Sequence, residues 1–161
     1  VSFNNEGFTW TSNGTDNYGG FGLRKLEPYE TVKVRATFDL ETGWQGIALR
    51  ANSTTSAGWG GNCQYIVIVK PDVLELQCWK PNGGHFFFEY PNNCIESGKE
   101  YLIEYGIKNK DDGSVDITFA VYGENIIEYN DADNPILTAG YLEFYNTSAG
   151  RNLIIKTAEG K

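Results

Sequence analysis

Apolar residues recur at every second position along most of this chain. In residues 31–40, TVKVRATFDL, one side carries Val32, Val34, Ala36 and Phe38, while the other carries mainly polar residues. Residues 101–107 and 115–121 alternate in the same way. A period of two is typical of antiparallel strands that have one buried and one solvated face. No window sustains the 3.6-residue period of an amphipathic helix, so we expect strands and no long helix.

Turn-forming residues separate these apolar stretches. Asn13-Gly14, Ser97-Gly98 and the glycine-containing segments 81–84 and 111–113 are examples, and such residues favour tight connections between strands. Strands at roughly 8–12-residue spacing are typical of sandwiches and barrels, and about eleven or twelve short strands fit the chain. No linker or repeat divides residues 1–161. The sequence therefore predicts a single all-β domain, a two-sheet antiparallel β-sandwich.

Composition excludes several classes of partner. Thirteen Lys and Arg against 21 Asp and Glu give a net charge of −8, whereas nucleic acids and anionic membranes need a basic surface. No apolar run approaches the ~18–20 residues of a membrane span, so we expect no membrane insertion. The chain opens with Val1 and contains no Met. We therefore expect a module excised from a larger multidomain protein, monomeric within that chain.

The three cysteines, Cys63, Cys78 and Cys94, contain no Cys-x-x-Cys pair, which disfavours a zinc site. A hairpin turning at residues 70–72 would place Cys63 opposite or diagonal to Cys78 on the same face. Two interpretations stay open. The cysteines are buried free thiols, or one disulfide forms in an extracellular protein.

Alternation also predicts which side chains face away from the core. In residues 43–51, GWQGIALRA, the apolar Ile47 and Leu49 face inward. The hairpin formed by residues 63–79 has a similarly apolar inward set. If these strands are neighbours, one outer face collects large or polar side chains above a floor of Gly46 and Ala48, namely Trp44, Arg50, Gln64, Glu75, Gln77 and Trp79.

Such a mixture suits a sugar. An indole stacks on the C–H face of a pyranose ring and buries apolar area, while amide, carboxylate and guanidinium groups bond the hydroxyls. The alternative is that the two indoles are half-buried packing residues and that the polar side chains are merely solvated. Trp59, in the glycine-rich segment 56–61, is either a clamp over a ligand or a plug beneath its own loop.

Two details of this face depend on register. A second outward stripe, formed by Tyr141, Glu143 and Tyr145, is the alternative platform. A four-residue loop at residues 81–84 places Trp79 beside Phe86, unless a bulge exchanges the faces.

Catalysis and metal binding have weaker signals. A glycoside hydrolase needs two carboxylates about 5–10 Å apart, and no Glu-x-Asp-x-x-Glu array occurs on one strand. With His85 as the single histidine and no serine nucleophile motif, we expect no enzyme activity. Asp131 and Asp133 offer oxygen ligands for calcium, or they cap their own turn. No cofactor is required, and structural calcium is the one candidate.

Several segments, in this order, carry a family resemblance: GWQGIALRAN at 43–52, VLELQCWK at 73–80, SVDITFAVYGENIIEYND at 114–131 and ILTAGYLEFYN at 136–146. They resemble the concanavalin A/laminin-G-like jelly roll found in many bacterial carbohydrate-binding modules. The resemblance runs from about Thr31 to Lys156 and does not specify a numbered family. It implies a non-catalytic module attached to a secreted glycoside hydrolase. Asp131 matches the Asp that follows the family's hairpin, where its role is turn capping, metal binding or ligand binding.

The expected function is therefore binding of a β-linked plant cell-wall polysaccharide, such as xylan or glucan, outside the cell or at its surface. Two alternatives stay open, because a fold does not determine a function. An adhesion or protein-binding domain would want a larger apolar patch. A small jelly-roll hydrolase or lyase would need the carboxylate array.

Overall fold

A computed structural model describes residues 2–5, 7–11, 20–41, 44–53, 62–147 and 151–160. Strands and connecting turns, without any helix, form these described parts. The strands are β1 (Ser2–Asn4), β2 (Gly7–Thr11), β3 (Gly20–Leu26), β4 (Thr31–Thr37), β5 (Gln45–Ala51), β6 (Gln64–Val69), β7 (Val73–Trp79), β8 (His85–Pro91), β9 (Glu100–Asn109), β10 (Val115–Val121), β11 (Glu124–Asp131), β12 (Gly140–Asn146) and β13 (Asn152–Gly160).

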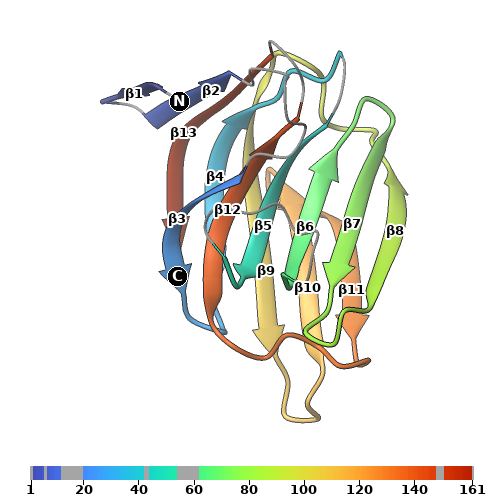
Figure 1. Cartoon of the computed structure of the whole chain (residues 1–161). Helices are drawn as coiled ribbons and strands as arrows, with labels where there is room; N and C mark the ends of the chain where they lie inside the picture. Colours follow the sequence, from blue (N-terminus) through green and yellow to red (C-terminus); the bar gives the residue numbers. More distant parts are fainter. Residues whose placement is uncertain are drawn as a thin grey trace.

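The strands form two stacked sheets, with the six-stranded sheet in front in Figure 1. Its order is β3-β12-β5-β6-β7-β8, and the seven-stranded sheet has the order β1-β2-β13-β4-β9-β10-β11. All pairings between neighbouring strands are antiparallel. The predicted two-sheet antiparallel β-sandwich is therefore confirmed. Within the described segments, no helix has the length and apolarity that crossing a membrane requires.

The core lies between the sheets, where alternation predicted it. On β4, Val32, Val34 and Ala36 are fully buried, as is Phe38 just beyond the strand. Residues of β5, β6, β7 and β12 face them across the sandwich and belong to the same apolar cluster. Hydrogen bonds join the sheets as well, since the Tyr105 hydroxyl donates to the backbone carbonyl of Tyr65 over 3.0 Å.

The central strands of the six-stranded sheet are also buried on their outer face, which alternation alone did not predict. Strands β5 and β6 are buried along their whole length. A second apolar cluster, formed by Ala48, Ile66, Ile68 and Tyr145, lies on this outer face. A side chain at Gly46 would collide with the carbonyl of Val67 and press on both isoleucines. The small residues of β5 therefore leave room for larger neighbours rather than forming an open floor.

Candidate functional site

The outer face of the six-stranded sheet brings together most of the predicted binding residues. In the β6–β7 hairpin, Gln64 lies opposite Trp79. On β7, Glu75, Gln77 and Trp79 follow one another at every second position and point to the same side. The parity argument therefore places these four side chains together, and the site can be built from them.

A row of hydrogen bonds runs along β7. The Trp79 indole Nε1–H donates to Gln77 Oε1 over 3.0 Å, and the Gln77 amide donates to Glu75 Oε1. Lys70 Nζ, just beyond β6, donates to Glu75 Oε2 over 2.9 Å. Since every member of this polar row holds the next, the side chains are fixed in one arrangement. Preorganised groups lose little conformational entropy on binding a ligand.

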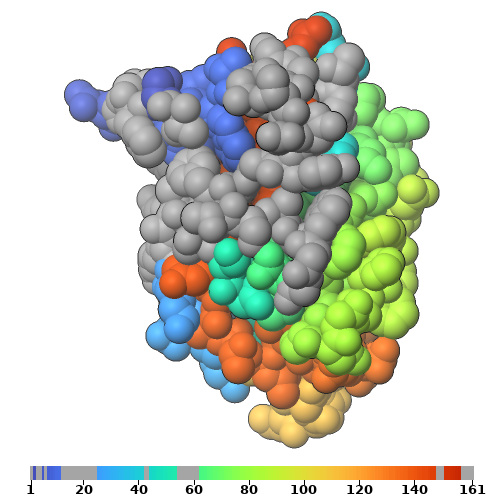
Figure 2. Space-filling view, in the orientation of Figure 1, coloured from blue at the N-terminus to red at the C-terminus, as the bar shows by residue number. Residues whose placement is uncertain are grey.

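Three aromatic rings form a platform at the β7–β8 end of the same face. Trp79 and His85 stack with centroids 4.9 Å apart and an angle of 24° between their planes. Phe87 lies 5.6 Å from Trp79 and 5.2 Å from His85. The Phe87 side chain is 49% exposed, so this aromatic platform presents apolar area to solvent. Figure 2 shows the β7–β8 region at the surface along the right side of this face.

The predicted neighbour of Trp79 on β8 was wrong by one residue. Phe86 lies opposite Cys78 on the inner side, and His85 lies opposite Trp79. The hairpin closes through a hydrogen bond of 2.8 Å from the Lys80 N–H to the Gly84 carbonyl. Within the loop, Gly83 adopts a φ of 85°. This loop is one residue shorter than expected, so every β8 side chain changes face.

Trp44 lies just before β5, on the predicted side. It is half-buried and packs against the second apolar cluster. Its backbone is fixed to the end of β12, because the Thr147 N–H donates to the Trp44 carbonyl over 3.0 Å. Trp59 lies outside the described residues, so its predicted contact stays a prediction.

The predicted outward orientation of Arg50 is wrong. Arg50 adopts a φ of 56° where the β5–β12 pairing shifts register between Tyr141 and Glu143. The bulge turns its side chain inward, leaving it 4% exposed. The guanidinium donates to the backbone carbonyls of Pro28, Ile107 and Ile136, and burial lowers its pKa to about 10. Arg50 therefore stabilises the sandwich interior and does not belong to the outer face.

The two platforms proposed as alternatives belong to one surface. Strand β5 lies between β12 and β6, and the Tyr145 side chain crosses it to reach Gln64. The Tyr145 hydroxyl lies 2.6 Å from Gln64 Oε1 and 2.6 Å from Glu143 Oε2. Glu143, which the sequence placed only in the secondary stripe, is fully buried here. Burial raises its pKa to about 7. Near neutral pH this carboxyl is therefore partly protonated.

The structure gives Asp131 and Asp133 partners within the chain. Asp131 is buried and forms an ion pair with Lys80, while the Tyr65 hydroxyl donates to the same carboxylate over 2.6 Å. Its second oxygen accepts from the Asp133 N–H over 3.2 Å, as in a self-capping turn. The Lys80 ammonium thus neutralises the Asp131 carboxylate, and the predicted calcium site stays a prediction. No group of three potential metal-ligating His, Cys, Asp or Glu side chains occurs in the described segments.

All three cysteines are free thiols. Cys78 lies opposite Tyr65, which places Cys63 diagonal to Cys78, as the hairpin predicted. Cys63 and Cys78 are buried, and burial raises the pKa of Cys78 to about 12. The structure thus matches the free-thiol interpretation.

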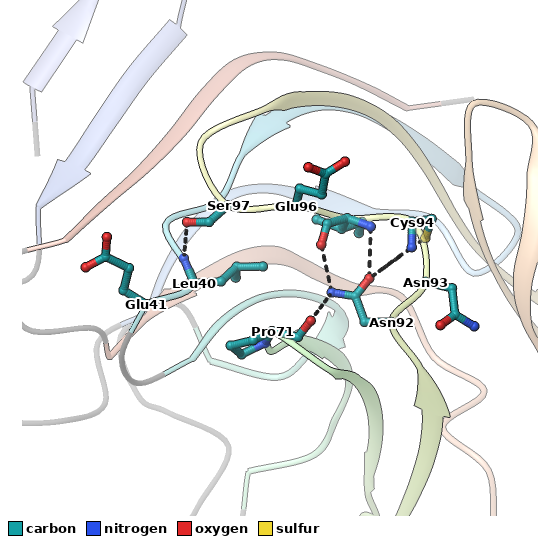
Figure 3. A pocket seen from close by; sticks show the side chains of 9 residues that line it. Leu40, Glu41, Pro71, Asn92, Asn93, Cys94, Glu96 and Ser97 are labelled. Carbon is teal, nitrogen blue, oxygen red and sulfur yellow. Dashed lines mark hydrogen bonds between the residues drawn. The ribbon is translucent and has the colours of Figure 1, made fainter.

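A separate hollow of about 610 Å³ lies at the loop end of the sandwich, between residues 92–97 and Leu40–Glu41 (Figure 3). The Asn92 amide donates to the carbonyls of Lys70 and Ile95, at 2.8 and 2.9 Å. The Leu40 N–H donates to Ser97 Oγ over 2.9 Å. These polar groups shape the loop itself, so the hollow is a weaker candidate than the outer sheet face.

No family model and no curated protein sequence matches the chain, whereas solved structures do. Carbohydrate binding module CBM66 from Bacillus subtilis matches with a TM-score of 0.69 at 13% identity, over 99% of this chain and 89% of that one. Sheep galectin-11, solved with glycerol, matches with a TM-score of 0.64 at 8% identity, over 88% of this chain and 98% of that one.

An alginate lyase, A1-II′ of polysaccharide lyase family 7, matches with a TM-score of 0.55 at 14% identity, over 88% of this chain and 64% of that one. These likenesses show a shared jelly-roll β-sandwich. The fold that the resemblance in the sequence implied is therefore confirmed.

Proposed function

We propose that this chain is a carbohydrate-binding module whose ligand lies on the outer face of the six-stranded sheet. One observation carries the proposal: the partly exposed aromatic platform of Trp79, His85 and Phe87 continues directly into the hydrogen-bonded polar row through Trp79. Rings offer a surface for the C–H face of a sugar. The polar row offers fixed donors and acceptors for its hydroxyl groups.

The structural likenesses support the same class of ligand. A carbohydrate-binding module, a galectin and an alginate lyase share the fold. Because a shared fold does not determine an activity, the residues of the site must decide among them. We propose the non-catalytic role, because the polar groups of the outer face described here bond mainly to one another. The proposal includes a secreted or cell-surface location, a monomeric module attached to an enzyme, and β-linked neutral polysaccharides such as xylan or glucan as first ligands to test.

Affinity electrophoresis tests this function. The protein is run through gels that contain xylan, β-glucan, mannan, levan, pectin or alginate, and reducing ends and unsaturated products are measured in parallel. We expect retardation by at least one neutral glycan without product formation. Product formation would establish an enzyme, and the absence of retardation in every gel would refute glycan binding.

Two aromatic variants then locate the site. Phe87→Ala removes an exposed ring and Trp79→Ala removes the ring that joins the platform to the polar row. Each should weaken binding by about 1–3 kcal/mol. Tyr29→Ala is the matched control, because Tyr29 is 63% exposed in the turn between β3 and β4. Equal binding by all three variants would exclude this face.

A further inference from the structure

Within the part of the chain that the structure describes, two buried polar atoms on the outer face of the six-stranded sheet lack a hydrogen-bond partner. They are Gln64 Nε2 and Glu143 Oε1, and their side chains are 1% and 0% exposed. A buried polar group left without a partner destabilises a protein by about 1–3 kcal/mol. Such groups are rare in folded proteins and call for a ligand or an ordered water.

Proton counting shows what each atom needs. The Tyr145 hydroxyl carries one proton but lies within 2.6 Å of both Gln64 Oε1 and Glu143 Oε2. With Glu143 protonated, the Tyr145 hydroxyl donates to the Gln64 carbonyl oxygen and accepts a hydrogen bond from the Glu143 carboxylic acid, so that both contacts are hydrogen bonds. The raised pKa of Glu143, about 7, agrees with a protonated acid. The remaining groups are then one amide donor, on Gln64, and one carbonyl acceptor, on Glu143.

The surroundings select a neutral partner. The apolar Ile66 and Ile68 lie beside the pair in the same outer-face cluster as Tyr145, against which Trp44 and Trp79 pack. Of the cations described on this face, Lys70 is ion-paired with Glu75, and Lys25 lies on β3 opposite Tyr141. An anionic sugar would therefore meet the Glu143 carboxyl with no described cation bonded to Glu143 or Gln64.

We propose that Gln64 and Glu143 form a subsite for one neutral sugar residue, whose hydroxyl groups accept from the Gln64 amide and donate to the Glu143 carbonyl oxygen. This subsite rests on the proposed function and specifies its ligand: neutral glycans bind, and polyuronates do not. A hydroxyl is both donor and acceptor, so it satisfies both unpartnered atoms. The half-buried indoles of Trp44 and Trp79 pack against the apolar cluster beside this subsite.

The test uses the whole chain at pH 5.5, where Glu143 is protonated. Binding of the strongest neutral glycan from the gel screen is measured by calorimetry for the parent and for Gln64→Met, Glu143→Met and Glu128→Gln. Gln64→Met removes the amide donor and should weaken binding by about 5- to 50-fold. Glu143→Met removes the carbonyl acceptor and should weaken binding to a similar extent. Glu128→Gln, on β11 of the other sheet, is the control.

The outcomes separate the subsite from the proposed function. Unchanged binding by Gln64→Met would overturn the subsite alone, because water would then satisfy both atoms. Tighter binding of alginate or polygalacturonate than of any neutral glycan would also overturn it. If Gln64→Met does not fold, Gln64→Glu, which replaces the donor by an acceptor at equal volume, must show the same loss. Absence of binding to every glycan defeats the proposed function and the subsite together.

Discussion

Replacing Glu143 by glutamine should stabilise the protein at alkaline pH and leave it nearly unchanged in acid. Burial raises the pKa of Glu143 to about 7, whereas an exposed glutamate has a pKa of about 4.3. The folded state therefore binds this proton more tightly than the unfolded state. The contribution of Glu143 to stability is full below pH about 4, falls between pH about 4 and 7, and is lost above pH 7.

The size of the effect follows from the same two pKa values. Their difference corresponds to at most about 3.7 kcal/mol, and access of water to the carboxylate reduces this to about 1–3 kcal/mol. Glu143→Gln cannot ionise and still donates to Tyr145, so its stability relative to the parent should rise by about that amount between pH 4 and 8.

Urea unfolding at pH 4, 5, 6, 7 and 8 measures this difference for the parent and Glu143→Gln. Glu89→Gln is the control, because Glu89 is an exposed carboxylate on β8 of the same sheet. A stability difference that stays constant with pH, or a parent that gains on the variant as pH rises, would refute a buried Glu143 whose pKa is raised.

Three further predictions concern the interior and are each tested by chemical unfolding or thiol chemistry. Arg50→Ala should destabilise the fold by about 3–5 kcal/mol in urea, because three backbone carbonyls lose their donor; an effect below about 1 kcal/mol would place the side chain in solvent. Lys80→Met should destabilise the fold by a similar amount, because it leaves the buried Asp131 carboxylate without its cation. The double variant Lys80→Met with Asp131→Asn should lose less stability, because the unpaired charge is gone; an equal or larger loss would contradict the ion pair. Cys78 should react with a thiol reagent only after unfolding, because it is fully buried and its pKa is raised to about 12; labelling of Cys78 in the native protein, read by mass spectrometry, would contradict this.

The sequence predicted the parts of the fold that depend on local alternation. The inward face of β4 and the outward set on β7 follow from a period of two. No bulge interrupts the pairing of β4 with β9 or the pairing of β7 with β6. The absence of a helical period correctly limited the fold class.

Alternation failed where the backbone departs from regular geometry. Arg50 has a positive φ in a bulge, and a non-glycine residue in that conformation gives no signal in the hydrophobic pattern. The position of Phe87 depended on one residue of loop length. The contact between Gln64 and Tyr145 joins residues 81 positions apart, so it follows from the order of strands and could not be derived from either segment alone.

The most direct test of glycan binding on the outer sheet face is the NMR signal of the Trp79 indole N–H during titration with the glycan selected in the gel screen. This proton is bonded to Gln77 and lies where the aromatic platform meets the polar row. Its signal, assigned with Trp79→Phe, should shift progressively to saturation, while the indole signal of Trp10 on β2 of the other sheet should not. A ligand that binds while the Trp79 signal stays fixed would show that the glycan site lies elsewhere.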